Sequence, residues 1–481
     1  MKSVPVLALA VMLGLLLTYP IQADKKALSQ SIEAREKSSW DIARRIWGWA
    51  EPGYQEKQSA KLLADTLEQA GFQVKRGVAK IPTAFVAEMG SGKPVIGIMG
   101  EYDALPGLSQ DAVPFRKIRK ETNYGHGCGH HLFGVASMSA TIALGEQIKA
   151  GKLKGTLRFY GCPAEEGGSA RVFMVREGLF KDCDIALHWH PSSRNSAGTS
   201  TNLARIAVKF QFHGKSSHAA GSPELGRSAL DAVELTNHAA QLLREHTPDF
   251  TRIHHVITGG GDAPNVVPNF AEVYYYVRHP DAEVVRKVYQ RLLKCAEAGA
   301  LATETKLKVN YLGGTVQMVP NAMLSKALLK NLRALNDMKY DDEETKFALR
   351  IRETLERKLP LESVSKVTAY NNVVNKGSTD VSDVSWVVPT GGFTTACWVP
   401  GTSGHTWQAT AAGGTSLGKK GMQLAAKVLA ATAWDLFHDP KLVAGAQAEF
   451  RIRMQGKTYD SLLLPNQPPP LDYRNPPNRG K

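Results

Sequence analysis

Cysteine is scarce in this sequence, and the scarcity narrows the class of protein. Only five cysteines occur among 481 residues, at positions 128, 162, 183, 295 and 397. A small disulfide-stapled scaffold needs a far denser pattern, so hydrophobic cores must hold this chain together. Cys162 and Cys183 fall in or beside expected strands, which favours buried free thiols over disulfides.

Long apolar runs are almost absent. The one candidate, residues 4–18, is too short and too close to the N-terminus for a membrane span. It follows Lys2 and precedes Ile21-Gln22-Ala23, a cleavage-site pattern. We therefore expect residues 1–23 to be a signal peptide, and the mature protein to be exported, periplasmic or secreted, without a membrane span. An uncleaved anchor is the weaker alternative.

Acidic residues are outnumbered, and neither internal repeats nor nucleic-acid-binding motifs occur. The 59 basic and 45 acidic residues give a net charge of +14. Because the basic residues are scattered, we expect no nucleic-acid partner. The basic cluster at residues 116–120 is interpreted as a solvated loop, with attraction of anionic substrates as the alternative. A chain of this length should divide into at least two domains.

The first part of the chain, residues 24–204, has the pattern of an α/β domain. Residues 95–99 form a short continuous apolar run, as expected for a buried parallel strand. The strand predicted at 156–160 leads to Glu165 and Glu166 beyond its C-terminal end, and the strand at 184–187 leads to His188 and His190. Ligands beyond the carboxyl ends of strands are typical of open α/β sheets.

Residues 205–314 change to a different pattern. Apolar residues recur at every second position from Ile206 to Phe212, which predicts a half-buried strand. The expected order is βαββαβ, a ferredoxin-like layer with two helices on one face and the other face and edge free for a partner. Residues 315–445 should return to the first domain. Residues 446–481 form a C-terminal tail, expected to be extended or disordered from Leu464.

A glycine-rich loop carries the first candidate metal ligands. Cys128 and His130 lie two residues apart in Gly125–His131, a spacing that requires a loop because such residues do not share a helix face. The intervening glycines tolerate unusual backbone angles. Glu165 and Glu166 follow in an apolar, glycine-rich setting. A metal cluster combined with paired carboxylates indicates metal-assisted hydrolysis, although adjacent glutamates are often only a solvated surface pair.

In this order, these and further segments resemble the aminoacylase and carboxypeptidase-type family of dinuclear metallohydrolases, in its amidohydrolase branch. The matching segments are Gly100–Leu108, Gly125–His131, Ala164–Gly168, Trp189–Pro191, Ser217–Ala220, Pro264–Pro268, Ser378–Val381 and His405–Gln408. The resemblance implies a zinc-exopeptidase-like α/β catalytic domain with an inserted ferredoxin-like dimerisation, or lid, domain. Glu101 stands where the older aminopeptidases have a ligand histidine, which favours the amidohydrolase branch.

The resemblance also implies roles for individual residues. Cys128 would bridge two divalent ions, zinc or manganese, and the remaining ligands would be His130, Glu166, His190 and His405. Glu165 would be the general base and Asp103 would orient a ligand histidine. His218 would reach across a homodimer to stabilise the charged intermediate, and Asn265 and Arg278 would bind substrate. Asp103 could equally be an aspartate that caps a turn. Arg278 could equally form an ordinary salt bridge at the end of a strand.

The predicted activity is hydrolysis of the amide bond of N-acyl or N-aroyl amino acids, such as p-aminobenzoyl-glutamate, by metal-activated water. One alternative is a metallo-exopeptidase, either a dipeptidase or a carboxypeptidase. Another is a catalytically inactive binding protein on the same scaffold, which the presence of every ligand and of Glu165 disfavours. The sequence leaves open whether a related second subunit takes part.

Overall fold

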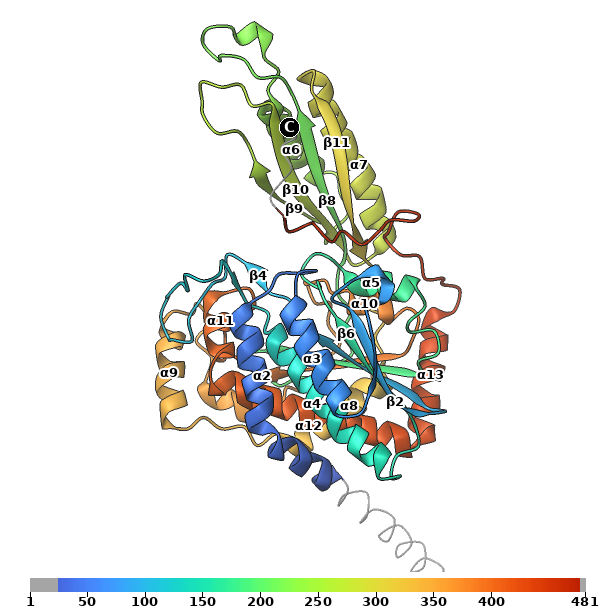
Figure 1. The fold of residues 1–481 in the computed structure, drawn as a ribbon. Coiled ribbons are helices and arrows are strands. Elements are labelled where there is room, and N and C mark those ends of the chain that lie inside the picture. Colours follow the sequence, from blue (N-terminus) through green and yellow to red (C-terminus); the bar gives the residue numbers. More distant parts are fainter. Residues whose placement is uncertain (1–24, 476–481) are drawn as a thin grey trace, which may run out of the picture.

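The computed structural model describes residues 25–475 and consists of two lobes (Figure 1). A six-stranded sheet forms the larger, catalytic lobe and a four-stranded sheet the smaller, lid lobe. None of the helices in the described range is both long and apolar enough to cross a membrane. The expected signal peptide lies outside the described residues.

The six-stranded sheet brings the functional segments to one edge. Strands β6, β3, β7 and β12 are neighbours and run parallel to one another. Beyond β6, strand β2 pairs antiparallel with β6, and β1 pairs antiparallel with β2. Parallel strands present their carboxyl ends at the same edge, where ligands bind in such sheets. The strands, in spatial order, are β1 (Gln73–Arg76), β2 (Phe85–Ser91), β6 (Gly155–Cys162), β3 (Val95–Glu101), β7 (Ile185–Ser192) and β12 (Thr390–Ala396).

Both faces of this sheet are buried, which explains its continuous apolar strands. Along β3, Ile96 and Ile98 belong to one core, and Val95 and Met99 to the core on the opposite face. The first core is formed with α2 (Glu36–Trp49), α3 (Lys57–Gln69), α4 (His130–Lys149), α8 (Ala322–Leu335), α12 (Ser416–His438) and α13 (Pro440–Met454). The second is formed with α5 (Ala170–Arg176) and α10 (Val381–Val384). Helix α11 (Trp407–Gly413) adds Ala409 and Ala412 to the first core. Outside these two cores lie β4 (Leu105–Pro106) and β5 (Tyr124–Gly125), and α9 (Asp342–Glu353) contributes to a smaller separate cluster.

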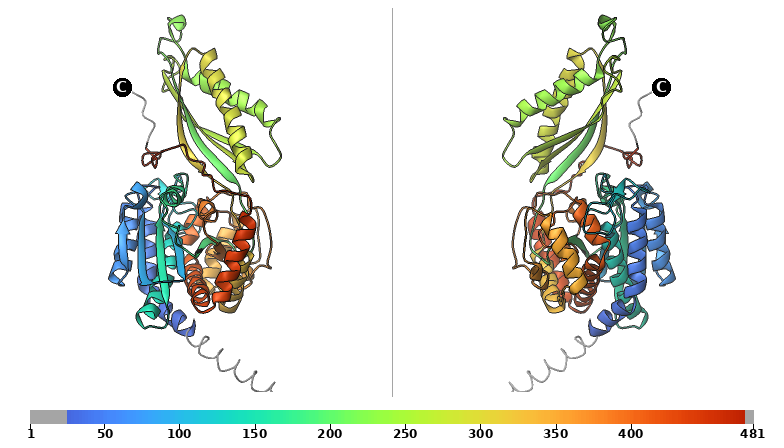
Figure 2. Two further views of the ribbon diagram at one scale, coloured as in Figure 1. Left: turned by 90° about the vertical axis from the view of Figure 1, so that its right-hand side faces the viewer. Right: turned by 90° about the vertical axis from the view of Figure 1, so that its left-hand side faces the viewer.

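The lid lobe has the ferredoxin-like arrangement expected from the sequence. Its strands β8 (Ala204–His213), β9 (Arg252–Gly259), β10 (Phe270–His279) and β11 (Lys306–Thr315) pair antiparallel in the order β11-β8-β10-β9. Helices α6 (Ala229–Arg244) and α7 (Ala282–Ala302) pack on one face, against Val208 and Phe210 of β8. The side views show both helices on the same side of these strands (Figure 2).

The C-terminal segment, residues 455–475, is extended as expected but is packed rather than free. Leu462 is fully buried in the lid core, and the side-chain amide of Gln467 donates to the carbonyl of Tyr311 at 2.9 Å. Lys209 of β8 donates to the carbonyl of Tyr473 at 3.2 Å. The expectation that the second face of the lid sheet is free for a partner is therefore wrong where this segment covers it.

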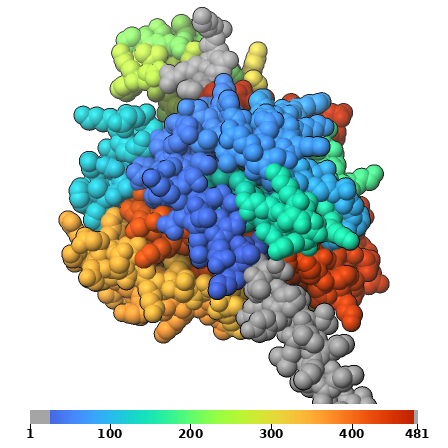
Figure 3. All heavy atoms as spheres, turned by 60° about the horizontal axis from the view of Figure 1, so that its bottom comes forward, coloured from blue at the N-terminus to red at the C-terminus, as the bar shows by residue number. Residues whose placement is uncertain are grey.

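The catalytic lobe is assembled from both ends of the chain. Seen from the side opposite the lid, its surface is formed by blue and teal N-terminal elements beside orange and red C-terminal ones (Figure 3). Strand β12 pairs with β7 across the whole intervening lid segment. The lid lobe is thus an insertion between two parts of one sheet.

Candidate metal centre and catalytic pocket

The glycine-rich loop before α4 fixes the spacing of the first two ligands. Helix α4 begins at His130, directly after Gly129, whose φ of 75° is left-handed. A Cβ at Gly127 would lie 2.4 Å from Cδ1 of Leu108. Only Gly129 therefore uses the conformational freedom expected of all the loop glycines. At Gly125 the lack of a side chain matters for a different reason, because a Cβ there would lie 2.0 Å from the backbone carbonyl oxygen of Leu108.

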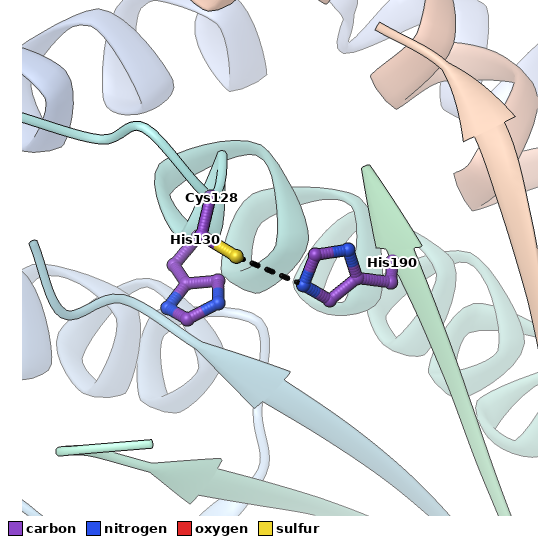
Figure 4. A group of neighbouring side chains, drawn as sticks. All are labelled: Cys128, His130 and His190. Atoms are coloured by element: carbon purple, nitrogen blue, oxygen red, sulfur yellow. Dashed lines mark hydrogen bonds between the residues drawn. The ribbon is translucent and has the colours of Figure 1, made fainter. Parts of the chain in front are cut away.

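Two potential metal-binding groups share one sulfur atom. Cys128, His130 and His190 form the first group, and Cys128, Glu166 and His405 the second, with the ligand atoms of each within 4.8 Å of one another. The Cys128 Sγ lies 3.3 Å from Nε2 of His190 (Figure 4). All five residues that the sequence indicated as ligands thus come together, with Cys128 in the position of a bridge.

Each ligand comes from a segment at the carboxyl edge of the parallel sheet. His130 starts α4, His190 lies near the end of β7, and Glu166 follows β6. His405 precedes α11 with a left-handed φ of 59°. The side chain of His405 is half exposed, whereas His130 is fully buried.

Asp103 holds two of these groups in place. One carboxylate oxygen lies 2.7 Å from Nδ1 of His130, and the other accepts the backbone N–H of Glu166 at 2.9 Å. When Nδ1 of His130 donates to the carboxylate, Nε2 is left as a lone-pair ligand. Asp103 therefore occupies the orienting position that the sequence suggested.

The donor atoms fit divalent ions. Nε2 of His130 and Oε1 of Glu166 are buried and make no well-aligned hydrogen bond, although Oε2 of Glu101 lies 2.9 Å from the first and Nε2 of His405 lies 3.1 Å from the second. Such crowding of unsatisfied polar atoms is costly unless something binds them. Burial and the charge of Glu166 raise the pKa of Cys128, but the imidazoles of His190, His130 and His405 outweigh them and lower it to about 6. A thiolate, imidazoles and a carboxylate suit zinc and other first-row divalent ions.

Glu165 lies beside the ligand cluster without belonging to either Cys128 group. One carboxylate oxygen of Glu165 lies within 4.8 Å of a carboxylate oxygen of Glu101, and within the same distance of a ring nitrogen of His130. Burial, followed by the charges of Glu166 and Glu101, raises the pKa of Glu165 well above its usual value. A raised pKa near a metal cluster is what a residue that accepts and returns a proton needs.

Glu101 is a site residue that the sequence analysis treated only as a departure from a pattern. Its Oε2 lies 2.9 Å from Nε2 of His130, and its Oε1 2.7 Å from Nη2 of the fully buried Arg171. Arg171 also pairs with the buried Asp380. The available signal was an acidic residue ending the apolar strand β3, whereas its arginine partner could not be found from the sequence.

One cavity of about 920 Å³ contains the cluster and part of the predicted substrate site. Arg278, Glu165 and four of the ligands, Cys128, Glu166, His190 and His405, line it. His218 and Asn265 do not; they lie together in the lid, where the N–H of Ala219 donates to the Asn265 carbonyl at 3.0 Å. Within one chain the structure therefore separates these two residues from the metal centre.

Two further histidines of the ligand loop, His126 and His131, have structural partners. Nε2 of His126 lies 3.1 Å from the carbonyl of Ile46, and Nε2 of His131 lies 3.0 Å from that of Gly413. His188 faces the cavity, and burial lowers its pKa to about 3. None of the three belongs to a metal-binding group of the described residues.

Comparisons with known proteins agree with this geometry. A family model described as peptidase family M20/M25/M40 matches residues 97–354. One of the subunits of the p-aminobenzoyl-glutamate hydrolase of Escherichia coli (strain K12) is 40% identical over 471 residues, covering 92% of this chain and 98% of that protein. The chain belongs to peptidase family M20/M25/M40.

Two further similarities are weaker. The Xaa-Arg dipeptidase of Homo sapiens is 29% identical over 443 residues, covering 87% of this chain and 90% of that protein. A crystal structure of aminobenzoyl-glutamate utilization protein from Klebsiella pneumoniae matches with a TM-score of 0.59 at 17% identity, covering 85% of this chain and 98% of that one, and supports the fold.

Family membership confirms that the chain is an amide-bond hydrolase with the predicted fold class. The matched range contains Cys128, His130, Glu166 and His190. His405 lies beyond the range that the family model matches, and the structure brings it together with the other four.

Proposed function

We propose that the protein is a dinuclear metal amidohydrolase that cleaves N-acyl or N-aroyl amino acids into an acid and an amino acid. The observation that carries the proposal is the sharing of Cys128 between two ligand groups, with the carboxylate of Glu165 beside them. The E. coli relative is named for hydrolysis of p-aminobenzoyl-glutamate, which makes this compound the first substrate to try.

Each residue of the pocket has a task in such a reaction. Divalent ions in the cluster would supply Lewis acidity and a water acidified for attack. Asp103 keeps the His130 imidazole in its ligand orientation through Nδ1. Glu165 accepts the proton of the attacking water and returns it to the leaving nitrogen. Arg278 binds the carboxylate of the amino acid half.

The ligand set is the basis for the choice of metal. The thiolate of Cys128 and the imidazoles favour zinc, whereas the carboxylate of Glu166 would also suit manganese. We propose zinc or manganese as the resident ions. Elemental analysis of the purified protein, followed by chelation and refilling with each metal, distinguishes them.

A homodimer would give His218 a site. His218 is exposed on the lid, and its Nδ1 accepts the N–H of Gly221 at 2.9 Å, so the proton is on Nε2, free to donate to a charged oxygen. Strand β9, at the edge of the lid sheet, exposes Val256 and Ile257. We propose that two copies associate through the lid and that each lends His218, with Asn265, to the pocket of the other.

We also propose export, on the basis of the N-terminal sequence alone, to a periplasm or the exterior. The E. coli relative is named as one subunit of its hydrolase, so a related second subunit is an additional partner to test. Purification of the full chain without and with a co-expressed relative would decide this point by comparing the activities.

A substrate panel tests the activity. The purified, metal-refilled protein is given p-aminobenzoyl-glutamate, acetylated amino acids and dipeptides, and release of the free amino acid is measured. Turnover of the aroyl and acyl compounds supports the proposal. Turnover of dipeptides alone would instead make the protein a dipeptidase, as the human relative is named.

A further inference from the structure

Three arginines reach the catalytic cavity from different parts of the chain. Arg205 is on β8, Arg278 on β10 and Arg474 on the C-terminal segment, and all three line the cavity that contains the metal ligands. Each has a buried Nε without a hydrogen-bond partner. Buried, incompletely satisfied cations are costly, so the arrangement is suited to an anion.

Their other partners are neutral. Arg205 donates to the hydroxyl of Ser169 at 2.6 Å, and Arg474 donates to the backbone carbonyl of Glu166. Arg278 makes a long contact of 3.4 Å with the hydroxyl of Ser378. These contacts orient the guanidinium groups without neutralising their charge.

The register of the lid sheet places two of these charges face to face. Arg205 pairs directly with Arg278 across β8 and β10. Both guanidinium carbons lie near the ring of Tyr276, at 4.8 and 5.4 Å from its centroid. Like charges in directly opposed positions destabilise a sheet. Burial and the charge of Arg205 accordingly lower the pKa of Arg278.

The C-terminal segment brings the third guanidinium to the same place. A Cβ at Gly167 would lie 3.0 Å from the hydroxyl of Tyr276 and 3.2 Å from Cε2 of Tyr473. The Cζ of Arg474 lies 4.7 Å from the ring centroid of Tyr473. The segment therefore completes a cluster, Arg205, Arg278 and Arg474, next to the turn that carries Glu165 and Glu166.

We infer that Arg205 and Arg474 bind a second carboxylate of the substrate, in the side chain of the amino acid that is released. This inference rests on the proposed function, in which Arg278 binds the first carboxylate. Arg205 and Arg278 both lie against the ring of Tyr276, so their guanidinium groups are close to each other. This short separation suits two carboxylates of one small amino acid. A carboxylate on the acyl half would lie across the scissile bond from Arg278. The preferred substrates are thus N-acyl derivatives of acidic amino acids.

Paired substrates test the inference. The kcat/KM values for p-aminobenzoyl-glutamate and p-aminobenzoyl-glutamine, which differ only in the side-chain charge, are compared, with an N-succinyl derivative of a neutral amino acid as a third substrate. We expect the glutamate compound to be favoured. Arg474→Gln should reduce the ratio of glutamate to glutamine kcat/KM by about 10- to 100-fold, mainly through KM, because a charge-assisted hydrogen bond is lost. Arg205→Lys, which keeps the charge, should reduce it less.

Two controls separate recognition from positioning. Tyr473→Phe removes a hydroxyl that donates to the Glu166 carbonyl at 3.0 Å, and should affect both substrates alike. Arg194→Gln removes one charge from an exposed arginine that lines the same cavity, and should leave the ratio unchanged. An equal loss for both substrates in Arg474→Gln, no wild-type preference for glutamate, or a preference for the succinyl compound would overturn the inference.

Binding of a dicarboxylate tests the subsite independently of hydrolysis. Glutarate should raise the melting temperature of the wild-type protein more than its half-amide, 4-carbamoylbutyrate, and the difference should vanish in Arg474→Gln. If no amide is hydrolysed but glutarate still discriminates, the proposed function fails and the subsite stands. Hydrolysis without any discrimination by glutarate would remove the subsite and leave the proposed function.

Discussion

The two lobes differ in whether their functional residues have a site within their own chain. The catalytic lobe gathers five candidate ligands and Glu165 from four separate segments, so one chain suffices to build the metal cluster. The lid contributes Arg278 to the cavity at its base, but places His218 and Asn265 outside it. The metal centre is thus built by one chain, whereas in the proposed dimer His218 and Asn265 of a second chain would complete the active site.

Metal removal should have the largest effect. Chelation followed by desalting should abolish hydrolysis, and refilling with zinc or manganese should restore it, since the ions activate the water. The apoprotein should also melt at a lower temperature, because ions bound only to the native state stabilise it. Activity that survives verified removal of the metal would contradict the dinuclear assignment and, with it, the catalytic half of the comparison.

Replacing the proton carrier should have the next largest effect. Glu165→Gln should lower kcat by about 10²- to 10⁴-fold, because an amide cannot relay the proton. Metal content should remain at the wild-type level, since Glu165 belongs to neither group that contains Cys128. Cys128→Ser is the matched control and should lower metal content as well as activity. Wild-type turnover by Glu165→Gln would show that another group moves the proton.

The lid histidine should have a smaller effect, and one that can be repaired between chains. His218→Ala should lower kcat by about 10²- to 10³-fold, as expected for one donor to a developing oxyanion. Mixing this variant with Glu165→Gln should restore up to about a quarter of wild-type activity, because half of randomly mixed dimers combine one intact pocket with one intact His218. A mixture no more active than its components, although subunits exchange, would place His218 in its own chain or outside catalysis.

The same contrast explains what could be predicted from the sequence. Local patterns were sufficient for the lid, where alternation from Ile206 to Phe212 gave a strand, and for the loop that holds Cys128 and His130. Segments of the resembling family supplied the distant ligand His405. These features are encoded in short stretches, each of which carries its own signal.

Features created by tertiary contacts were missed. Arg171 reaches Glu101 and Asp380, the latter 209 residues away, and no local pattern links the three. Tyr473 and Arg474 lie in a proline-rich tail whose composition predicts no packed structure, yet they hold the Glu166 carbonyl. Their order comes from the lid sheet and the catalytic turn that they contact, not from propensity.

The smallest expected effect concerns stability and compares one buried acid in each lobe. In the lid, Glu272 accepts hydrogen bonds from Gln211 and Thr258 at 2.6 Å and lies 3.5 Å from the ammonium of Lys209. In the catalytic lobe, burial and the charge of Asp103 raise the pKa of Glu56 from 4.5 to about 8. One acid has a cation beside it and the other has a second carboxylate.

The sign of the pH dependence follows from proton binding. Between pH 4.5 and about 8, Glu56 is protonated in the folded protein and ionised in the unfolded chain. The folded state then binds more protons, so the stability that depends on this group falls as the pH rises through this window. In Glu56→Gln the side chain does not ionise, so the free-energy cost of keeping a buried carboxyl protonated is absent. This variant should melt at a higher temperature than the wild type at pH 8, by about 2–4 °C for each kcal/mol of unfolding free energy gained. The difference should disappear towards pH 4.5.

Glu272→Gln is the matched variant in the lid. It removes the charge that faces Lys209 and should lower the melting temperature at pH 8, because the buried ammonium loses its counter-charge. The melting temperatures of both variants are measured at pH 5 and 8. Shifts of opposite sign at pH 8 would show that the catalytic lobe contains a buried acid whose ionisation destabilises the fold. Glu56 also supports the turn at Ala164, whose N–H it accepts at 2.8 Å. Shifts of the same sign in both lobes would mean that Glu56 is as well compensated as Glu272.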